Sequence, residues 1–273
     1  MKPDPFDPFA NNIPISPEYE IIEKEVVAAI DVGLKSKRND QPPRKYLGAS
    51  RVGDDCERRL AYEYHQFKKD EGSEFKGKTL RIFDMGHDGE ERMAEYLRLA
   101  GFDLHTHNEE GKQFGMSDAE GKFKGHLDGV IHGGPAISGL KYPCLWENKA
   151  LGDKSWNDFR NRKLFTSKPV YYAQVQVYMG YFDLSSCLFT ALNRDTGEIG
   201  VEVVQLSYSS CQKYINKAVG IVNSQTPDEF KRIGKGVDDY KCKWCDYKKL
   251  CYGVTEHPEI KAVNPADGWH MGA

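Results

Sequence analysis

The sequence predicts an α/β domain in which helices flank a mixed central sheet. Segments with helical periodicity alternate with segments of strand-like alternation, and the strand-like runs end at glycine-containing turns. Hydrophobic residues make up 39% and charged residues 29% of the 273 residues, a balance typical of globular proteins. The formal net charge of −3 excludes a uniformly basic coat and leaves room for local basic patches.

The two ends of the chain differ in composition from the part between them. We expect residues 1–45 to form an N-terminal arm, partly disordered or linker-like, with an amphipathic piece at 19–34. The first twenty residues contain five prolines and lack the apolar core of a signal peptide, so a cytoplasmic protein is expected. The main domain is placed at 46–255 and a C-terminal tail at 256–273.

Each element of the main domain has its own signal. Ser50 is expected to cap the first helix, and a second helix should run from about Met85 to Ala100, where Gly101 ends it. Strands are expected at 123–132, 143–150, 186–193 and 199–206, with a hairpin turn at 194–197. Helices are expected at 170–182 and 207–224. Residues 169–193 carry a single charge, Asp183, but their pattern changes from helical to strand-like, which favours a buried helix and strand over a membrane span.

Two strands carry acidic and basic side chains in an apolar setting. Glu147 and Lys149 are two residues apart, so they project from the same face of their strand. Burying both charges is costly unless something uses them. Asp128 lies in the preceding strand and would converge on Glu147 if the two strands pair, which makes an oxygen-rich site suited to Mg²⁺. A plain salt bridge between Glu147 and Lys149 is the alternative.

The following helix and an upstream helix offer further candidates. Gln174 and Tyr178 are four residues apart and share a helix face, and a buried glutamine needs a polar partner such as the sheet face carrying Lys149. Tyr178 could instead be plain core. Two histidines compete for a place near Asp128; we favour His87, at the start of the second helix, over His126.

Three cysteines are spaced C-x2-C-x5-C near the C-terminus: Cys242, Cys245 and Cys251. A closed tetrahedral zinc site or a cuboidal iron–sulfur cluster needs a fourth ligand. Cys56 is the one other cysteine in a polar, motif-like setting, so we expect it to complete the set and tie the start of the domain to its tail.

Basic residues concentrate in two segments, at 141–168 and 231–249, each with seven basic and three acidic residues. Such belts suit local contacts to nucleic-acid phosphates. In the first belt, aromatic and basic residues alternate. The expected DNA-binding residues there are Lys154, Trp156, Arg160, Arg162 and Lys163. Trp156, Phe159 and Phe165 could stack on single-stranded bases. The alternative is an amphipathic helix packed on the sheet.

Taken together, these motifs resemble the RecB-like branch of the PD-(D/E)XK nuclease superfamily. Within it they are similar to the CRISPR-associated exonucleases (the fourth Cas family), their phage-encoded relatives and the AddB-type nuclease domains. The resemblance spans about residues 50–252 and depends on the combined set Asp128, Glu147-x-Lys149, Gln174-xxx-Tyr178, His87 and the four cysteines.

The resemblance implies a restriction-endonuclease-like core with a C-terminal iron–sulfur staple. It implies that Asp128 and Glu147 bind Mg²⁺ or Mn²⁺, together with the carbonyl of Asn148 and the imidazole of His87. Lys149 would then position the attacking water, Gln174 would steady Lys149 or the substrate, and Tyr178 would line the DNA path. A [4Fe–4S] cluster is implied at Cys56, Cys242, Cys245 and Cys251, with Zn²⁺ as the alternative.

The expected function is therefore a metal-dependent DNA exonuclease acting on single-stranded ends, in phage or bacterial recombination, repair or CRISPR adaptation. No helicase-type phosphate loop is present in the sequence, so a helicase or other recombination or CRISPR-adaptation partner would be a separate chain. Two alternatives remain open at this point. One is a non-catalytic DNA-binding module with a structural iron–sulfur or zinc site, and the other is a zinc-stapled protein-interaction domain.

Overall fold

The computed structural model describes residues 17–254. The chain divides into two compact units: the N-terminal part up to Pro43 together with Phe75–Met85, and Arg44–Glu74 together with the chain from Gly86 onward. The C-terminal tail expected at 256–273 lies outside the described residues, as do the first sixteen residues of the N-terminal arm.

The first unit consists of helix α1 (Pro17–Asn39) and the opening turns of helix α3 (Gly77–Leu99). The amphipathic piece expected in the N-terminal arm is thus part of a regular helix of 23 residues. Asp31 of α1 forms an ion pair with Arg81 of α3, and the rings of Phe75 and Phe83 meet edge to face at 5.2 Å. The ion pair with α1 and the ring contact with the preceding Phe75 stabilise the first turns of α3, which begins eight residues before the expected Met85.

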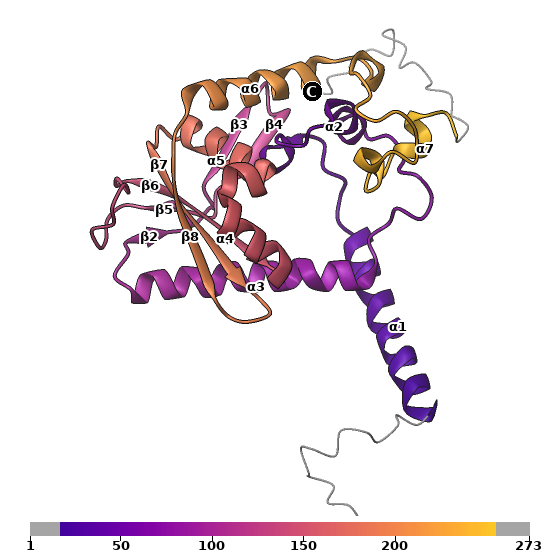
Figure 1. The fold of residues 1–273 in the computed structure, drawn as a ribbon, viewed down its shortest axis with the longest axis horizontal. Coiled ribbons are helices and arrows are strands. Elements are labelled where there is room, and N and C mark those ends of the chain that lie inside the picture. Colours follow the sequence, from indigo (N-terminus) through magenta and orange to yellow (C-terminus); the bar gives the residue numbers. More distant parts are fainter. Residues whose placement is uncertain (1–16, 255–273) are drawn as a thin grey trace, which may run out of the picture. The chain divides into compact units, whose positions relative to one another are not determined.

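The second unit contains two mixed sheets, which Figure 1 shows with helices against them. The strands are β1 (Leu47–Gly48), β2 (Leu104–His105), β3 (Gly115–Asp118), β4 (Phe123–His126), β5 (Gly129–Ile131), β6 (Cys144–Leu151), β7 (Ser186–Asn193) and β8 (Ile199–Gln205). Three strands pair in the order β1-β4-β3 and five in the order β2-β5-β6-β7-β8. In the larger sheet β6 and β7 are parallel and the other neighbours are antiparallel. The mixed α/β class is confirmed, but the expectation of a single central sheet is wrong.

The division into two sheets has its origin in the segment expected to be one strand at 123–132. Backbone pairing stops at Leu127 and Asp128, so that β4 joins the small sheet and β5 joins the large one. The fully buried Leu127 donates its backbone N–H to the carbonyl of Phe114 at 3.0 Å, which continues the antiparallel register of β4 with β3 by one residue before the chain passes to the large sheet. Asp128 therefore lies at the junction between the sheets.

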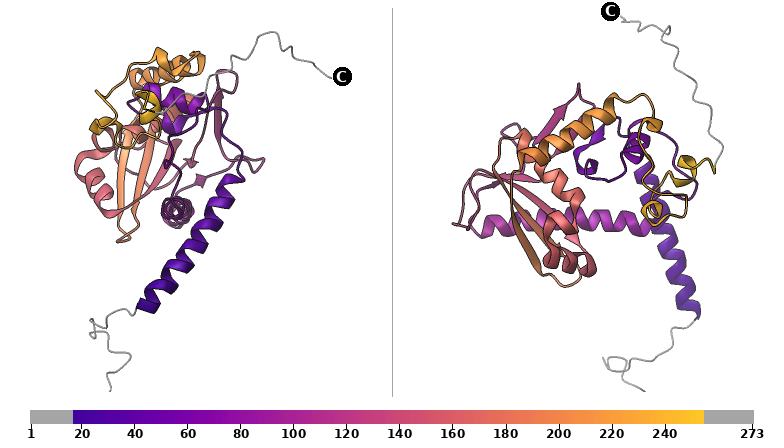
Figure 2. Two further views of the ribbon diagram at one scale, coloured as in Figure 1. Left: turned by 90° about the vertical axis from the view of Figure 1, so that its right-hand side faces the viewer. Right: turned by 45° about the horizontal axis from the view of Figure 1, so that its top comes forward.

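The second unit has helices on both faces of the large sheet and further helices packed outside them (Figure 1, Figure 2). They are α2 (Glu57–Tyr64), the later part of α3, α4 (Asp153–Ser167), α5 (Pro169–Tyr181), α6 (Tyr208–Asn223) and the short α7 (Lys248–Cys251), with 3-10 turns η1 (Ala49–Arg51), η2 (Pro227–Glu229) and η3 (Tyr240–Cys242). Helix α5 contacts β6, α6 lies along α5, and α2 contacts α6. On the other face, Met93 and Leu97 of α3 pack with Trp146 of β6.

Local signals account for several boundaries. Gly197, with φ of +80°, donates its N–H to the carbonyl of Asn193 at 2.7 Å and closes the expected hairpin turn between β7 and β8. Ser207 caps α6 by accepting a hydrogen bond from the N–H of Ser210. The expectation that Ser50 caps the first helix is wrong, because Ser50 lies within η1 and the cap of α2 is Cys56. Within residues 17–254, no helix is both long and apolar enough to cross a membrane.

Candidate active site

The pairing of β5 with β6 brings Asp128 and Glu147 to the same level of the sheet. Gly129 pairs with Trp146 in antiparallel register, so the preceding Asp128 lies level with Glu147. A glycine is needed at 129 because a Cβ atom there would lie 2.7 Å from a methyl carbon of Leu104. The backbone N–H of Asn148 donates to Oδ2 of Asp128 at 2.8 Å and fixes the carboxyl group across the strand boundary.

The two faces of β6 are chemically distinct. On one face Lys149 forms an ion pair with Glu147, and its Nζ atom lies 4.0 Å from Oδ2 of Asp128. One ammonium group therefore faces both carboxylates. On the other face the indole N–H of Trp146 donates to Thr190 at 3.0 Å, and Thr190 donates to Oδ1 of Asn148 at 2.8 Å. Asn148 thus turns its side chain away from Lys149 and reaches Asp128 through its backbone N–H.

Helix α5 supplies Gln174 to the Glu147 face. The Nε2 atom of Gln174 donates to Oε1 of Glu147 at 2.6 Å, so the polar partner of this glutamine lies on the expected strand face, the one that carries Lys149. Lys149 is longer than Glu147 and extends past it, to 5.4 Å from the ring of Tyr171. Tyr178 is 2% exposed and packs against Gly125 of β4. In this structure Tyr178 is part of the core, and the expectation that it lines a DNA path is wrong.

Helix α3 approaches β6 closely through a glycine. A Cβ atom at Gly89 would lie 3.1 Å from the Cβ atom of Ala150, so a larger residue would push the helix away from the strand. His87 is exposed on this helix and lies close enough to Asp128 to interact with it electrostatically. The competing His126 lies in β4, opposite Gly115 of the small sheet.

Glu90 was missed by the sequence reasoning. It lies one turn after His87 on α3 and interacts electrostatically with Asp128 and Lys149. Burial and then the nearby charge of Asp128 raise the pKa of Glu90 to about 7. The available signal was the three-residue spacing from His87, which places both side chains on one side of the helix.

The three carboxyl groups bring more negative charge than one lysine offsets. Burial, followed by the charge of Asp128, raises the pKa of Glu147 to about 8. Burial also raises the pKa of Asp128, although Lys149 and the N–H of Asn148 oppose the rise. Burial alone would lower the pKa of Lys149, but Glu147 and Asp128 outweigh it and raise that pKa. Removing carboxylates from water raises their pKa, and a nearby cation reverses the effect.

This electrostatic excess fits a divalent cation. Glu147 is fully buried, and its Oε2 atom has no hydrogen-bond partner among residues 17–254. An orphaned carboxylate oxygen in this position is the kind of ligand that Mg²⁺ and Mn²⁺ prefer. No set of three or more His, Cys, Asp or Glu side chains in the described part of the chain is already drawn together into a coordination shell. The donor chemistry therefore fits a metal, while the side chains are not gathered around one point.

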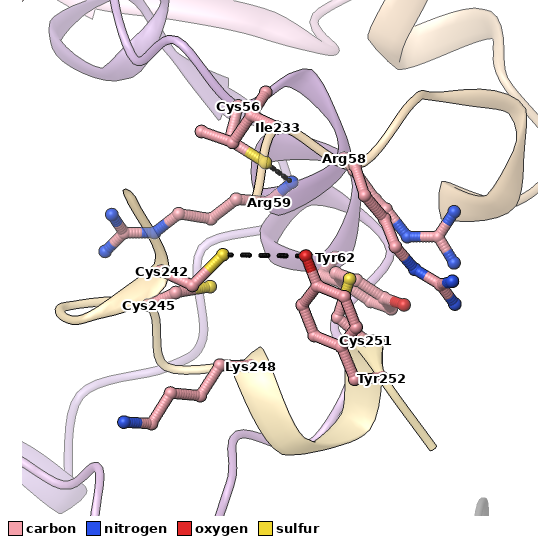
Figure 3. A pocket seen from close by; sticks show the side chains of 11 residues that line it. Cys56, Arg58, Arg59, Tyr62, Ile233, Cys242, Cys245, Lys248, Cys251 and Tyr252 are labelled. Carbon is pink, nitrogen blue, oxygen red and sulfur yellow. Dashed lines mark hydrogen bonds between the residues drawn. The ribbon is translucent and has the colours of Figure 1, made fainter. Parts of the chain in front are cut away.

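The four cysteines expected to act together line one cavity, with Cys56 from the start of α2 and Cys242, Cys245 and Cys251 from the C-terminal segment (Figure 3). The Sγ atom of Cys56 accepts a hydrogen bond from the N–H of Arg59 at 3.4 Å, and the Sγ atom of Cys242 lies 3.9 Å from the hydroxyl of Tyr252. Burial raises the pKa of Cys245 to about 11, with further contributions from Cys56 and Cys242. The cavity is also basic, because its lining includes Arg58, Arg59, Arg232 and Lys248.

The basic segment after β6 forms α4, and its aromatic residues divide into two groups. Trp156 is 4% exposed and donates its indole N–H to the carbonyl of Ala191 at 3.0 Å, and Phe159 is also buried. Neither ring can stack on a base, so this expectation is wrong for both; Phe165 is exposed. Trp156 and Phe159 pack as the alternative predicted, on the inner side of a helix that lies against the sheet. The basic residues themselves are exposed: Lys154, Arg160, Arg162 and Lys163. Arg162 pairs with Asp158 at 2.7 Å.

No family model matches the chain, and no curated protein matches it. Among solved structures, SSO0001 is 14% identical with a TM-score of 0.47, covering 84% of this chain and 96% of its own. LHK-Exo, an alkaline exonuclease from Laribacter hongkongensis solved with dAMP, is 15% identical with a TM-score of 0.44, covering 73% and 90%. A phage-related exonuclease from Haemophilus somnus 129PT is 13% identical with a TM-score of 0.43, covering 65% and 91%. These values describe a distant likeness of fold.

Proposed function

We propose that the chain is a metal-dependent deoxyribonuclease that hydrolyses phosphodiester bonds, acting as an exonuclease on the ends of single-stranded DNA. The observation that carries this proposal is the position of Lys149, whose ammonium group faces the carboxylates of both Asp128 and Glu147. One acid is enough for an ion pair with the half-buried Lys149, whereas phosphodiester hydrolysis would use the lysine and both acids.

Asp128 and Glu147 would hold Mg²⁺ or Mn²⁺, with His87 and Glu90 of α3 beside them. When bound, such a metal polarises the phosphate and lowers the pKa of water at the site. The structure supports the roles of Asp128 and Glu147 through their burial, their raised pKa values and the unpartnered Oε2 atom of Glu147. The carbonyl of Asn148 remains a proposed ligand.

The chain's own groups supply orientation and charge. Lys149 would orient the attacking water and offset the negative charge that develops on the phosphate oxygens. Gln174 would hold the carboxyl group of Glu147 in one rotamer through its 2.6 Å hydrogen bond. The N–H of Asn148 would do the same for Asp128. Both carboxyl groups are therefore positioned before substrate arrives, which lowers the cost of reaching the reactive geometry.

We also propose that Cys56, Cys242, Cys245 and Cys251 hold a [4Fe–4S] cluster, with Zn²⁺ as the alternative occupant. Four thiolates carry a strong negative charge, and the four basic side chains lining the same cavity would stabilise it. The cluster would link the start of α2 to the C-terminal segment, closing a long loop of chain. Its proposed part is structural, separate from the carboxylate site.

The test is anaerobic purification with metal analysis, followed by digestion of end-labelled single- and double-stranded DNA with and without Mg²⁺ or Mn²⁺. We expect metal-dependent release of nucleotides from single-stranded ends, abolished in Lys149→Ala and retained in the control Lys37→Ala, at an exposed position of α1. DNA binding with no turnover under any metal would instead identify a non-catalytic DNA-binding module. An absorbance near 400 nm distinguishes iron–sulfur from zinc.

A further inference from the structure

The C-terminal segment between Lys231 and Lys249 has a positive charge that its own acids do not neutralise. It contains seven lysines and arginines and three aspartates. Asp239 accepts hydrogen bonds from the N–H groups of Lys235 and Lys241, both at 2.9 Å, and Asp246 pairs with Lys69 at 2.7 Å. Across residues 17–254, none of the seven basic side chains lies within 4.0 Å of a carboxylate.

Two aromatic side chains project from the same segment into solvent. Tyr240 and Trp244 are each 79% exposed, and the Nζ atom of Lys243 lies 5.2 Å from the centre of the Trp244 ring. The neighbouring tyrosines are used internally: Tyr247 stacks on Tyr62 at 5.3 Å, and the hydroxyl of Tyr252 donates to the carbonyl of Gly234 at 2.6 Å. The local fold is therefore held without Tyr240 and Trp244.

The exposed aromatics are presented by a backbone that is fixed to the rest of the second unit. The carboxylate of Asp70 accepts the N–H groups of Lys249 at 2.8 Å and Leu250 at 3.1 Å. The N–H of Asp70 donates to the carbonyl of Asp246 at 2.7 Å. These bonds tie the segment to the chain that follows α2, so little ordering is needed when a ligand binds.

We propose that Tyr240, Trp244 and the lysines around them form a contact for single-stranded DNA that is distinct from the carboxylate site. Exposed aromatic rings stack on unpaired bases without sequence preference, and unpaired lysines contact the phosphates between them. This proposal rests on DNA being the substrate. It assigns to Tyr240 and Trp244 the stacking role that the buried Trp156 and Phe159 cannot perform.

The test measures the affinity for fluorescein-labelled (dT)20 by fluorescence anisotropy in EDTA, where hydrolysis does not occur. We expect Trp244→Ala to weaken binding about tenfold and Tyr240→Ala to weaken it several-fold, in line with base stacking on aromatic rings. Trp244→Phe should bind like the wild type. Tyr208→Ala is the matched control, because Tyr208 is 77% exposed on α6, and it should change nothing. Lys241→Gln together with Lys243→Gln should reduce the slope of log affinity against log salt by about 1.4.

A second readout separates this proposal from the proposed catalytic function. Hydrolysis of bis(p-nitrophenyl) phosphate has no bases to stack, so Trp244→Ala should retain wild-type turnover. Wild-type (dT)20 affinity in both Trp244→Ala and Tyr240→Ala would overturn the contact and leave the nuclease proposal intact. Weakened binding in a protein that hydrolyses no phosphodiester would support the contact and overturn the nuclease. A wild-type protein that does not bind (dT)20 would overturn the contact. If Trp244→Ala melts early, the affinity of Tyr240→Ala decides the question.

Discussion

The backbone N–H of Asn148 donates a 2.8 Å hydrogen bond to Oδ2 of Asp128, joining the centre of β6 to the junction between the two sheets. This bond explains how a residue outside regular strand pairing keeps a defined position. Asp128 is 8% exposed, and its carboxyl group would otherwise be free to rotate between the two sheets. Asn148 of the large sheet thus orients Asp128, and Gln174 of helix α5 orients Glu147.

Asp128→Asn is expected to abolish nuclease activity without unfolding the protein. The amide oxygen of asparagine still accepts the N–H of Asn148, but the side chain has no charge to bind a metal. We expect at least a 100-fold loss of DNA hydrolysis, with a melting temperature equal to or above that of the wild type, because a buried like charge near Glu147 is removed. End-labelled digestion and thermal melts measure both. Asp88→Asn, at an exposed position of α3, is the control. Activity within tenfold of wild type in Asp128→Asn would contradict the proposed role.

Lys149 and Glu147 should behave as one energetic unit in a double-mutant cycle. At pH 9, above the pKa of about 8 for Glu147, Lys149→Met leaves Glu147 buried without its ion-pair partner, which we expect to cost about 3–5 kcal/mol of unfolding free energy. Adding Glu147→Gln removes the stranded charge and should restore most of this loss. Urea unfolding in EDTA measures the stability of the wild type, the two single variants and the double variant. Lys154→Met, at an exposed position of α4, serves as control. Additive effects of the two substitutions would show that the pair is not coupled in solution.

The metal-free protein should lose stability as pH rises, and Glu90 should account for part of the loss. Its pKa is about 7 in the folded protein and near 4.3 when unfolded, so the folded state binds more protons between these values. Stability linked to Glu90 is therefore fully present below about pH 4 and is lost as pH rises through 7. Glu90→Gln should gain a few degrees of melting temperature over the wild type at pH 8 and clearly less at pH 5. Thermal melts in EDTA measure this difference.

The neighbouring Glu91→Gln is the control for this pH effect, because Glu91 is exposed on the same helix. Mg²⁺ should remove the difference between wild type and Glu90→Gln at pH 8, since a bound cation stabilises the ionised carboxylates. A wild-type melting temperature that rises between pH 5 and 8 in parallel with that of Glu90→Gln would show that Glu90 titrates normally.

Local patterns predicted the parts of the site that depend on a single element. The two-residue alternation in β6 was enough to place Glu147 and Lys149 on one face, and the helical spacing around Gln174 was enough to predict a buried polar contact with that face. These relationships depend on backbone geometry within one strand or one helix. They required no knowledge of how distant segments meet, which is why the structure reproduces them.

Relationships that depend on tertiary packing were missed or misread. Glu90 lies near Asp128 and Lys149 only because α3 approaches β6 where Gly89 meets Ala150. These two residues are 61 positions apart in the sequence. The break at Leu127 was hidden because alternation continues through it, although pairing changes sheet. Aromatic residues between basic ones give the same pattern for a DNA-binding surface and for an amphipathic helix, and Trp156 proved to be of the second kind.

Cys56→Ser tests the proposed cluster without disturbing the helix that Cys56 begins. The thiol of Cys56 caps α2, and serine is a good helix cap, so any loss reflects the metal site and not the helix. We expect bound iron, or zinc, to fall by at least half and the melting temperature to drop by about 5–10 °C, because a metal that binds only the folded state stabilises it. Metal analysis, absorbance near 400 nm and thermal melts are the measurements.

Cys211→Ala is the control for Cys56→Ser, because Cys211 is buried in α6 and does not line the cysteine cavity. It should keep its full metal content. A wild-type protein purified anaerobically without iron or zinc, or a Cys56→Ser protein with unchanged metal content, would contradict the assignment of this cavity as a metal site.

Trp156 should matter for stability and not for DNA binding. Its ring is buried against the large sheet, and its indole N–H satisfies the carbonyl of Ala191. Trp156→Phe keeps most of the packing and removes this hydrogen bond, so we expect a loss of about 1–3 kcal/mol in unfolding free energy and (dT)20 affinity within twofold of wild type. The exposed Phe165→Ala should leave stability nearly unchanged. A tenfold loss of affinity in Trp156→Phe at unchanged stability would mean that the ring contacts DNA, which requires α4 to leave the sheet when substrate binds.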